Sequence, residues 1–180
     1  MGEDKSVIVG FTGKSGVGKS TIAKYYAKVH GYHYLDIDEV GHELLNTPEI
    51  QNQIEEKFGI SVSSTNRKKL GELVFTNRHD EMKILADITW EGMRKIIDNN
   101  IELFKDEGIV LDWILLPHTH YFKMCDKKVL VKCPEELRRE RVKKRDNIND
   151  AELDLRDSAS IEYNENDFNE VIMNRGVYVV

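Results

Sequence analysis

An eight-residue segment near the start of the chain, GKSGVGKS at residues 13–20, constrains the fold more than any other feature. It fits the pattern GxxxxGK[ST] at every fixed position. Such a loop turns its backbone N–H groups inward around an anion, and the helix that follows adds its positive N-terminal end. The flanking sequence agrees, because residues 7–12 are an apolar run and residues 20–29 carry apolar side chains at helical spacing. This context favours a nucleotide phosphate site over a glycine-rich turn that binds nothing.

Apolar segments with the length of strands alternate with helical patterns along the rest of the chain. Residues 38–99 show helical spacing without a strand pattern, and helices are also expected from Pro134 to Asp146 and over residues 149–161. The alternation predicts an α/β fold with a central, mostly parallel five-stranded sheet and helices on both faces. Besides residues 7–12, the predicted strands are 32–35, 109–116, 128–131 and the core strand 171–173, with a short edge strand at 177–180.

The composition limits the partners and the compartment. A chain of 180 residues fits one domain with its own core. The net charge of −6 argues against broad, nonspecific binding to nucleic acid. Cys125 and Cys133 form no CxxC pair and have no zinc-ligand spacing, so we expect a reducing, cytoplasmic compartment. No apolar run approaches ~18 residues, so we expect no membrane span.

The surroundings of the loop indicate which kind of P-loop protein this is. A GTPase normally carries an NKxD motif, which this sequence lacks, and a motor or AAA-type ATPase would be longer. We therefore expect a small-molecule kinase, in which Lys19 reaches the β- and γ-phosphates of ATP, Ser20 is a ligand of Mg²⁺ and Thr21 contacts the α-phosphate. The expected ATP-binding residues of the loop are Gly13, Ser15, Gly16, Val17, Gly18, Lys19, Ser20 and Thr21.

Several short motifs occur in the order found in one kinase family. They are FTG and GKST within residues 11–21, LDIDEV at 35–40, NRKKLGELVF at 66–75, Arg141, Arg145-Asp146 and Arg156 at lid spacing, and VIMNRG at 171–176. Over nearly its whole length the chain resembles the dephospho-coenzyme A kinases. The resemblance implies a P-loop NTPase fold that uses ATP and Mg²⁺ to phosphorylate the ribose 3′-hydroxyl of dephospho-CoA. It also implies a helical acceptor-binding insertion and a helical lid.

We accordingly expect a single P-loop kinase domain over residues 1–180. Its parts are a core of about residues 5–37, 107–136 and 168–180, a helical acceptor region of about 38–106, and a lid of about 137–162.

Three aspartates lie where chemistry is expected. Asp36 follows the second predicted strand, at the sheet edge where ligands bind, and the resemblance implies that it is the catalytic base. Asp38 would hold water around Mg²⁺, or it would cap a helix that begins nearby. Asp112 interrupts a buried strand, where a charge is costly unless it is paired or faces a site. The substrate-binding candidates are Asp38, Asp112 and two arginines from the resemblance, Arg67 and Arg94.

Six basic residues fall within residues 138–145. Arg138, Arg141 and Arg145 share one helical face through three- and four-residue spacing. That face would close over the triphosphate as a lid, although a solvated helix paired to its own glutamates is the alternative. We expect Arg141 to be catalytic, Arg145 to bind ATP, and Arg138 and Arg139 to be surface charges. The resemblance adds one further ATP-binding residue, Asn174, beside the adenine.

Departures from the family on the acceptor side keep other functions open. Trp90-Glu91 replaces the family's His-Pro, and the proline and glutamate expected after Asp112 are missing. A related nucleoside or nucleotide kinase is therefore an alternative, as is an ATP-binding regulatory protein that does not catalyse. The intact phosphate loop and Asp36 argue against the regulatory protein. We expect ATP and a hydroxyl acceptor as partners, with neither nucleic acid nor membrane.

Overall fold

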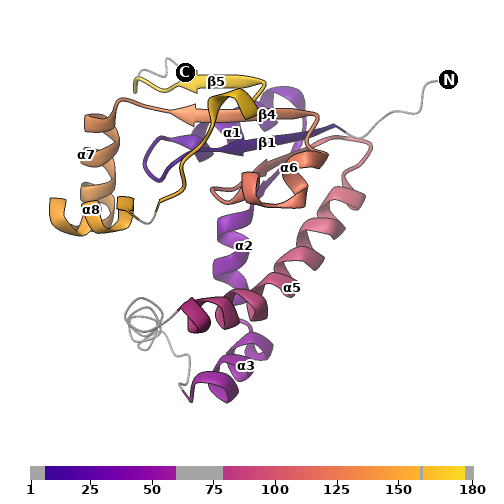
Figure 1. Cartoon of the computed structure of the whole chain (residues 1–180). Helices are drawn as coiled ribbons and strands as arrows, with labels where there is room; N and C mark the ends of the chain where they lie inside the picture. The colour runs from indigo at the N-terminus through magenta and orange to yellow at the C-terminus, as the bar shows by residue number, and fades with distance from the viewer. Residues whose placement is uncertain (1–6, 60–78, 159, 177–180) are drawn as a thin grey trace. The chain divides into compact units, whose positions relative to one another are not determined.

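The computed structural model describes residues 7–59, 79–158 and 160–176. Five strands form one sheet (Figure 1): β1 (Ile8–Thr12), β2 (His33–Asp36), β3 (Ile109–Asp112), β4 (Lys127–Lys132) and β5 (Glu170–Met173). Their order is β2-β3-β1-β4-β5, and every neighbouring pair is parallel. The predicted α/β fold with a five-stranded parallel sheet is confirmed.

Two inner strands, β1 and β3, are buried along their whole length. All residues of β1 and β3 are buried, as expected for parallel strands whose near-continuous apolar sequence is covered on both faces. Phe11 of β1 lies in one cluster with Ala23 and Ala27 of helix α1 (Lys19–His30) and with Val131 of β4. This core fixes the end of β1 and the start of α1, and therefore the loop between them.

The strand predicted over residues 109–116 is shorter in the structure. It ends at Asp112, after which the Trp113 amide donates a hydrogen bond of 3.1 Å to the Phe11 carbonyl. The chain then turns into the short 3-10 helix η1 (Leu116–His118), and the Trp113 side chain is buried. Asp112 therefore ends the strand and does not interrupt it, which places its carboxyl group at the edge of the sheet where ligands bind.

The prediction that residues 171–173 form a core strand is wrong in one respect. They do form a strand, but among the described strands β5 pairs only with β4 and lies at the end of the strand order (Figure 1). Val171 and Met173 are 40% and 47% exposed. An apolar triplet alone does not reveal whether a strand has one neighbour or two. The edge strand predicted at 177–180 lies outside the described residues.

The helices around the sheet follow the predicted order with two differences. The helix expected over residues 149–161 ends earlier, and a short helix after β3 carries no sequence signal that we used. Besides α1, these elements are α6 (His120–Met124), α7 (Glu135–Asp146), α8 (Asp150–Ser158) and the 3-10 helix η2 (Glu165–Asp167).

The chain divides into two compact units, residues 1–36 with 103–180, and residues 37–102. The second unit contains α2 (Ile37–Leu44), α3 (Pro48–Phe58) and most of α5 (His79–Leu103). Ile50 and Ile54 of α3 form its buried cluster, against which Ile88 of α5 packs. Within residues 7–59, 79–158 and 160–176, no helix has the length and apolar character needed to cross a membrane.

Candidate active site

The loop at residues 13–18 connects β1 to α1 and is enclosed by neighbouring backbone and side chains. Gly18 is the N-cap of α1, with φ 83° and ψ 22°. A Cβ atom on Gly16 would lie 2.5 Å from Val142 Cγ2 of α7, and one on Gly18 would lie 2.3 Å from Asn174 Nδ2. Both glycines also have the left-handed φ that side chains disfavour. The sequence pattern therefore reflects a real geometric requirement at these two positions.

The first side chain of α1 enters a buried polar network at the ends of the strands. Lys19 Nζ pairs with Asp112 Oδ1, and the two residues are 9% and 0% exposed. The Tyr34 hydroxyl donates to Asp112 Oδ2 over 2.7 Å and lies 3.3 Å from Asp36 Oδ2. The buried charge of Asp112 is thus balanced by a cation and a hydroxyl, which is the condition for burying it.

The sheet order brings Asp36 and Asp112 together. They are register partners on β2 and β3, and Asp112 is also the partner of Phe11 on β1, just before the loop. Both carboxyl groups therefore lie at the carboxyl edge of the sheet, beside the start of α1. This is the position at which open parallel sheets bind ligands.

Tyr34 is a residue of the site that sequence reasoning missed. Burial, together with its hydrogen bond to Asp112, raises the pKa of Tyr34 far above its ordinary value, so the group stays a neutral hydroxyl. Ser20, the predicted metal ligand, has a smaller and opposite effect on the pKa of Tyr34. Because side chains two apart on a strand share a face, Tyr34 could have been found from Asp36 by the period of two.

The loop is also held by Asn174, which follows β5 and is 4% exposed. Its Nδ2 atom donates to the Val17 carbonyl over 2.7 Å, and its Oδ1 atom accepts from the Gly176 amide over 2.9 Å. Sequence resemblance predicted Asn174 beside the adenine, and that role stays a prediction. The structure assigns it a direct contact with the phosphate loop.

Two of the predicted lid arginines lie at the loop. A Cβ atom on Gly18 would lie 3.5 Å from Arg141 Nη1. Arg145 donates to the Ser15 hydroxyl over 3.0 Å and forms an ion pair with Asp146 over 2.6 Å. Arg145 first, and Arg156 of α8 second, lower the pKa of Asp146 to about 2.

The prediction that Arg138 is a surface charge is wrong. Its side chain is 4% exposed and forms ion pairs with Glu135 of α7 and Asp157 of α8. It also donates to the Ser15 carbonyl over 3.3 Å. Helical spacing placed Arg138 on the same face as Arg141 and Arg145, but only the tertiary structure reveals that this face meets the loop.

Arg139 differs from Arg138 although it is the next residue of α7. Its side chain is 25% exposed and pairs with Asp150 and Asp154 of α8, both of which are mostly exposed. The prediction that Arg139 carries a surface charge is confirmed.

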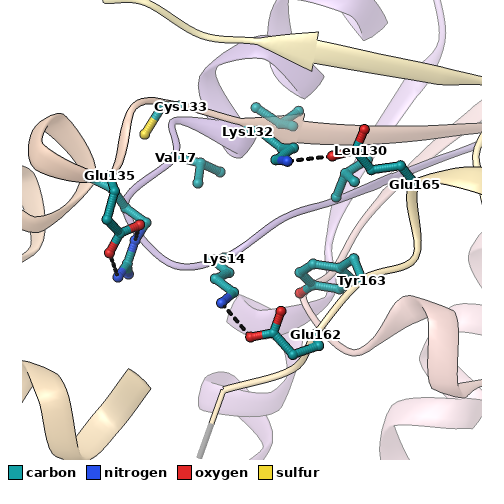
Figure 2. A pocket seen from close by; sticks show the side chains of 11 residues that line it. Lys14, Val17, Leu130, Lys132, Cys133, Glu135, Glu162, Tyr163 and Glu165 are labelled. Atoms are coloured by element: carbon teal, nitrogen blue, oxygen red, sulfur yellow. Dashed lines mark hydrogen bonds and ion pairs between the residues drawn. The ribbon is translucent and has the colours of Figure 1, made fainter. Parts of the chain in front are cut away.

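A cavity of about 200 Å³ lies between the loop and the end of β4 (Figure 2). Its charged lining residues are paired with one another: Lys14 with Glu162 over 2.8 Å, Lys132 with Glu165, and Arg138 with Glu135 of the same helix. Figure 2 shows Lys14 of the loop pointing toward Glu162, in the segment that follows α8. The segment around Glu162 therefore contacts the loop through a side chain that the GxxxxGK[ST] pattern leaves variable.

Of the four predicted substrate-binding residues, Asp112 lies in the first unit, and its role toward a substrate stays a prediction. The other three belong to the second unit or lie outside the described residues. Asp38 is in the first turn of α2, which begins at Ile37, so it is not the cap of a helix starting at Glu39. A carboxylate in a first turn interacts favourably with the helix dipole. Arg94 is an exposed residue of α5. Arg67 lies outside the described residues, and all three roles stay predictions.

The fold and this site define a class. A glycine loop between a buried strand and a helix, with a lysine and two carboxylates at the carboxyl edge of a parallel sheet, is the arrangement of a P-loop kinase. The same fold occurs in the shikimate kinase from Acinetobacter baumannii, with a TM-score of 0.51 and 17% identity over 94% of this chain and 84% of that chain.

Comparison with known families identifies the group within this class. The family model of dephospho-CoA kinase (CoaE) matches residues 7–177. The dephospho-CoA kinase of Helicobacter pylori is 34% identical over 157 residues, covering 81% of this chain and 76% of that protein. That of Dehalococcoides mccartyi is 33% identical over 136 residues, covering 72% and 68%. The chain belongs to the dephospho-CoA kinase family.

Solved structures agree at the level of the fold. The protein TT1252 from Thermus thermophilus has a TM-score of 0.80 and 25% identity over 96% of this chain and 90% of that chain. The dephospho-CoA kinase from Campylobacter jejuni has a TM-score of 0.57 and 23% identity over 98% and 91%.

Proposed function

We propose that this chain transfers the γ-phosphoryl group of ATP to the ribose 3′-hydroxyl of dephospho-CoA, giving CoA and ADP. Membership of the family supports the reaction. The observation that carries it is the cluster of Lys19, Asp112 and Asp36 at the start of α1, beside a loop shaped to hold phosphate. Phosphoryl transfer needs positioning and charge stabilisation more than covalent chemistry, and this cluster offers both.

Lys19 neutralises charge on the β- and γ-phosphates in this proposal. Asp112 forms an ion pair with Lys19 and so fixes the ammonium group beside the loop. The Gly16 and Gly18 amides and the N-terminus of α1 add further positive potential. Arg141 and Arg145 lie at the same loop and would reduce the negative charge that develops during transfer.

The donors at the strand ends fit a magnesium ion. Mg²⁺ prefers oxygen ligands and commonly uses one or two carboxylates together with substrate phosphates and water. Ser20 near the start of α1 and Asp112 at the end of β3 supply a hydroxyl and a carboxylate for such an ion. When bound there, Mg²⁺ would supply electrostatic stabilisation of the phosphate charge.

Asp36 is the proposed base. Its carboxylate orients the acceptor hydroxyl and accepts its proton, a role for which the edge position beside the loop is suitable. Tyr34 stays neutral and lies within reach of both carboxylates, which reduces the repulsion between them. Asn174 beside the adenine, and Asp38, Arg67 and Arg94 on the acceptor, complete the proposed set. A cytoplasmic location stays a prediction.

The test is ADP release with ATP and Mg²⁺ against dephospho-CoA, nucleosides and nucleoside monophosphates. We expect turnover with dephospho-CoA, a loss of about 10²–10⁴ in kcat for Asp36→Asn, and near-complete loss for Lys19→Ala. Asp106→Asn, which removes an exposed carboxylate of the same unit, is the matched control and should behave as wild type. Turnover only with nucleosides or nucleotides would replace the named acceptor, and ATP binding without turnover would favour a regulatory protein.

A further inference from the structure

The buried polar residues of the described part of the chain gather at the phosphate loop. They are Thr12, Lys19, Asp112, Arg138 and Asn174. Thr12 precedes the loop, Lys19 ends it and Asp112 binds Lys19. Arg138 and Asn174 come from distant parts of the sequence, and each donates a hydrogen bond to a backbone carbonyl of the loop.

The hydrogen bonds from Arg138 and Asn174 reach two peptide groups of the loop that are separated by one other peptide group. Arg138 binds the carbonyl of Ser15, and Asn174 binds the carbonyl of Val17. The described peptide bonds are trans. In a trans peptide the C=O and N–H groups point in opposite directions. The amides of Gly16 and Gly18 therefore point away from the side chains that hold their peptide groups.

We propose that Arg138 and Asn174 are positioning residues of the phosphate loop. They hold the Ser15 and Val17 carbonyls from outside, so that the Gly16 and Gly18 amides stay turned toward a bound phosphate. The inference deepens the proposed function and rests on it, because it assumes that the loop binds the phosphates of ATP. An anion site of inward-facing amides gains affinity when its backbone is already ordered.

Arg138 is suited to this task by its planar group of donors. Its Nε and Nη2 atoms bind Glu135 over 2.9 and 2.5 Å, Nη2 also binds Asp157, and Nη1 is left for Ser15. The two carboxylates fix the guanidinium plane and raise the pKa of Arg138 above its ordinary value. A lysine cannot offer donors in these fixed directions.

The backbone around the contact leaves little freedom. A Cβ atom on Gly16 would lie 3.0 Å from the Arg138 carbonyl and 3.3 Å from Arg138 Cγ. The backbone of α7 thus lies against the loop at the point where Arg138 donates its hydrogen bond to Ser15. Asp157 belongs to α8, so the guanidinium group of Arg138 links α8 to the loop.

The experiment measures ADP binding and the amide resonances of Gly16 and Gly18 by ¹⁵N NMR. In wild type we expect ADP to move both amide protons downfield. Arg138→Gln should lose the Gly16 response, keep the Gly18 response and weaken ADP binding roughly tenfold. Asn174→Ala should show the reverse pattern, because it releases the Val17 carbonyl.

Two matched variants separate positioning from general loss of structure. Lys143→Gln removes another basic side chain of α7, which pairs with Asp150 of α8. Asn169→Ala removes an amide side chain at the other end of β5, where it accepts from the Lys128 amide. Both should keep the two glycine responses and the wild-type affinity for ADP.

The outcomes distinguish the two proposals. If wild type does not bind ADP, the proposed function fails and this inference fails with it. If wild type binds, and Arg138→Gln and Asn174→Ala keep both glycine responses, only the positioning role is wrong. If Arg138→Gln does not fold, Arg138→Lys retains the charge beside Asp157 and should still lose the Gly16 response. A retained Gly16 response in that variant would overturn the role of Arg138.

Discussion

Two groups of ion pairs in this protein differ in burial more than in chemistry. At the strand ends, Lys19 and Asp112 are 9% and 0% exposed, and Asp112 also accepts a hydrogen bond from the Tyr34 hydroxyl. On the surface of α7 and α8, Arg139 pairs with Asp150 and Asp154, whose side chains are 62% and 66% exposed. The sequence counts both groups as opposite charges. The structure separates them, because a buried charge depends on its partner while a solvated charge does not.

The largest effect should come from breaking the buried pair. Asp112→Asn leaves the Lys19 ammonium group without its counter-charge, so we expect a loss of about 3–5 kcal/mol in the free energy of unfolding. Urea denaturation measures it. The double variant Asp112→Leu with Lys19→Met should recover much of this stability without recovering ATP binding. A loss below about 1 kcal/mol would place this pair with the surface pairs.

The two ends of α1 test how tightly the side chains around the loop are packed. Gly18 and Gly31 both cap this helix with left-handed backbone, at φ 83° and 70°. A Cβ atom on Gly18 would meet Asn174 at 2.3 Å, whereas one on Gly31 would have nothing within 4 Å.

We therefore expect Gly31→Ala to cost about 1–2 kcal/mol from backbone strain alone. Gly18→Ala should cost more, by about 1–3 kcal/mol, because it adds overpacking. Thermal and urea unfolding of the two variants provide the comparison. Equal losses of unfolding free energy in the two variants would mean that the side chains around Gly18 rearrange to accommodate a methyl group.

Asp146 is intermediate between the two groups, since it is 20% exposed and paired with Arg145 and Arg156. These arginines lower its pKa from 3.8 to about 2. The pairing therefore stabilises the fold at pH values above about 4, and this contribution disappears as the pH falls from about 4 to about 2.

Asp146→Asn should accordingly destabilise the protein by up to about 2 kcal/mol at neutral pH. The difference from wild type should shrink on acidification and vanish near pH 2. Unfolding free energies of both proteins between pH 2 and pH 7 measure this. A difference that does not change with pH would show that the carboxylate charge is not responsible.

The smallest effect should come from the surface pairs. Arg139→Gln is expected to change the free energy of unfolding by less than about 1 kcal/mol, because exposed ion pairs gain little and are screened by salt. Chemical denaturation at low and high salt gives the measurement. A loss as large as that of Asp112→Asn would remove the distinction between the two groups.

The residues that the sequence predicted well are those whose backbone is constrained locally. Gly16 and Gly18 are required by left-handed φ and close contacts, so the loop pattern carries its own geometry. The position of Asp36 at the end of β2 could be predicted because the end of a strand is a local feature, and its catalytic role stays a prediction. Its neighbour Asp112 was identified, but the pairing of β2 with β3 that brings them together is a property of the sheet order.

The residues that were missed or misjudged depend on which surfaces meet. From the sequence, Arg138 is indistinguishable from the other basic residues of its helix. Its burial follows only from the contact of α7 with the loop. The sequence identifies Tyr34 only as a residue of a predicted strand. Its place in the site depends on hydrogen bonds to two carboxylates that come from different strands. Local patterns specify single elements, whereas these side chains gain their roles from contacts between elements.

The central claim is that this chain phosphorylates the 3′-hydroxyl of dephospho-CoA. The most direct measurement is ³¹P NMR of a reaction containing the protein, ATP, Mg²⁺ and dephospho-CoA. We predict a new phosphate monoester on the ribose 3′ position that forms in equal amount to ADP and forms about 10²–10⁴ times more slowly with Asp36→Asn. ADP formed without that monoester, or no change in ATP although the protein binds it, would contradict the account.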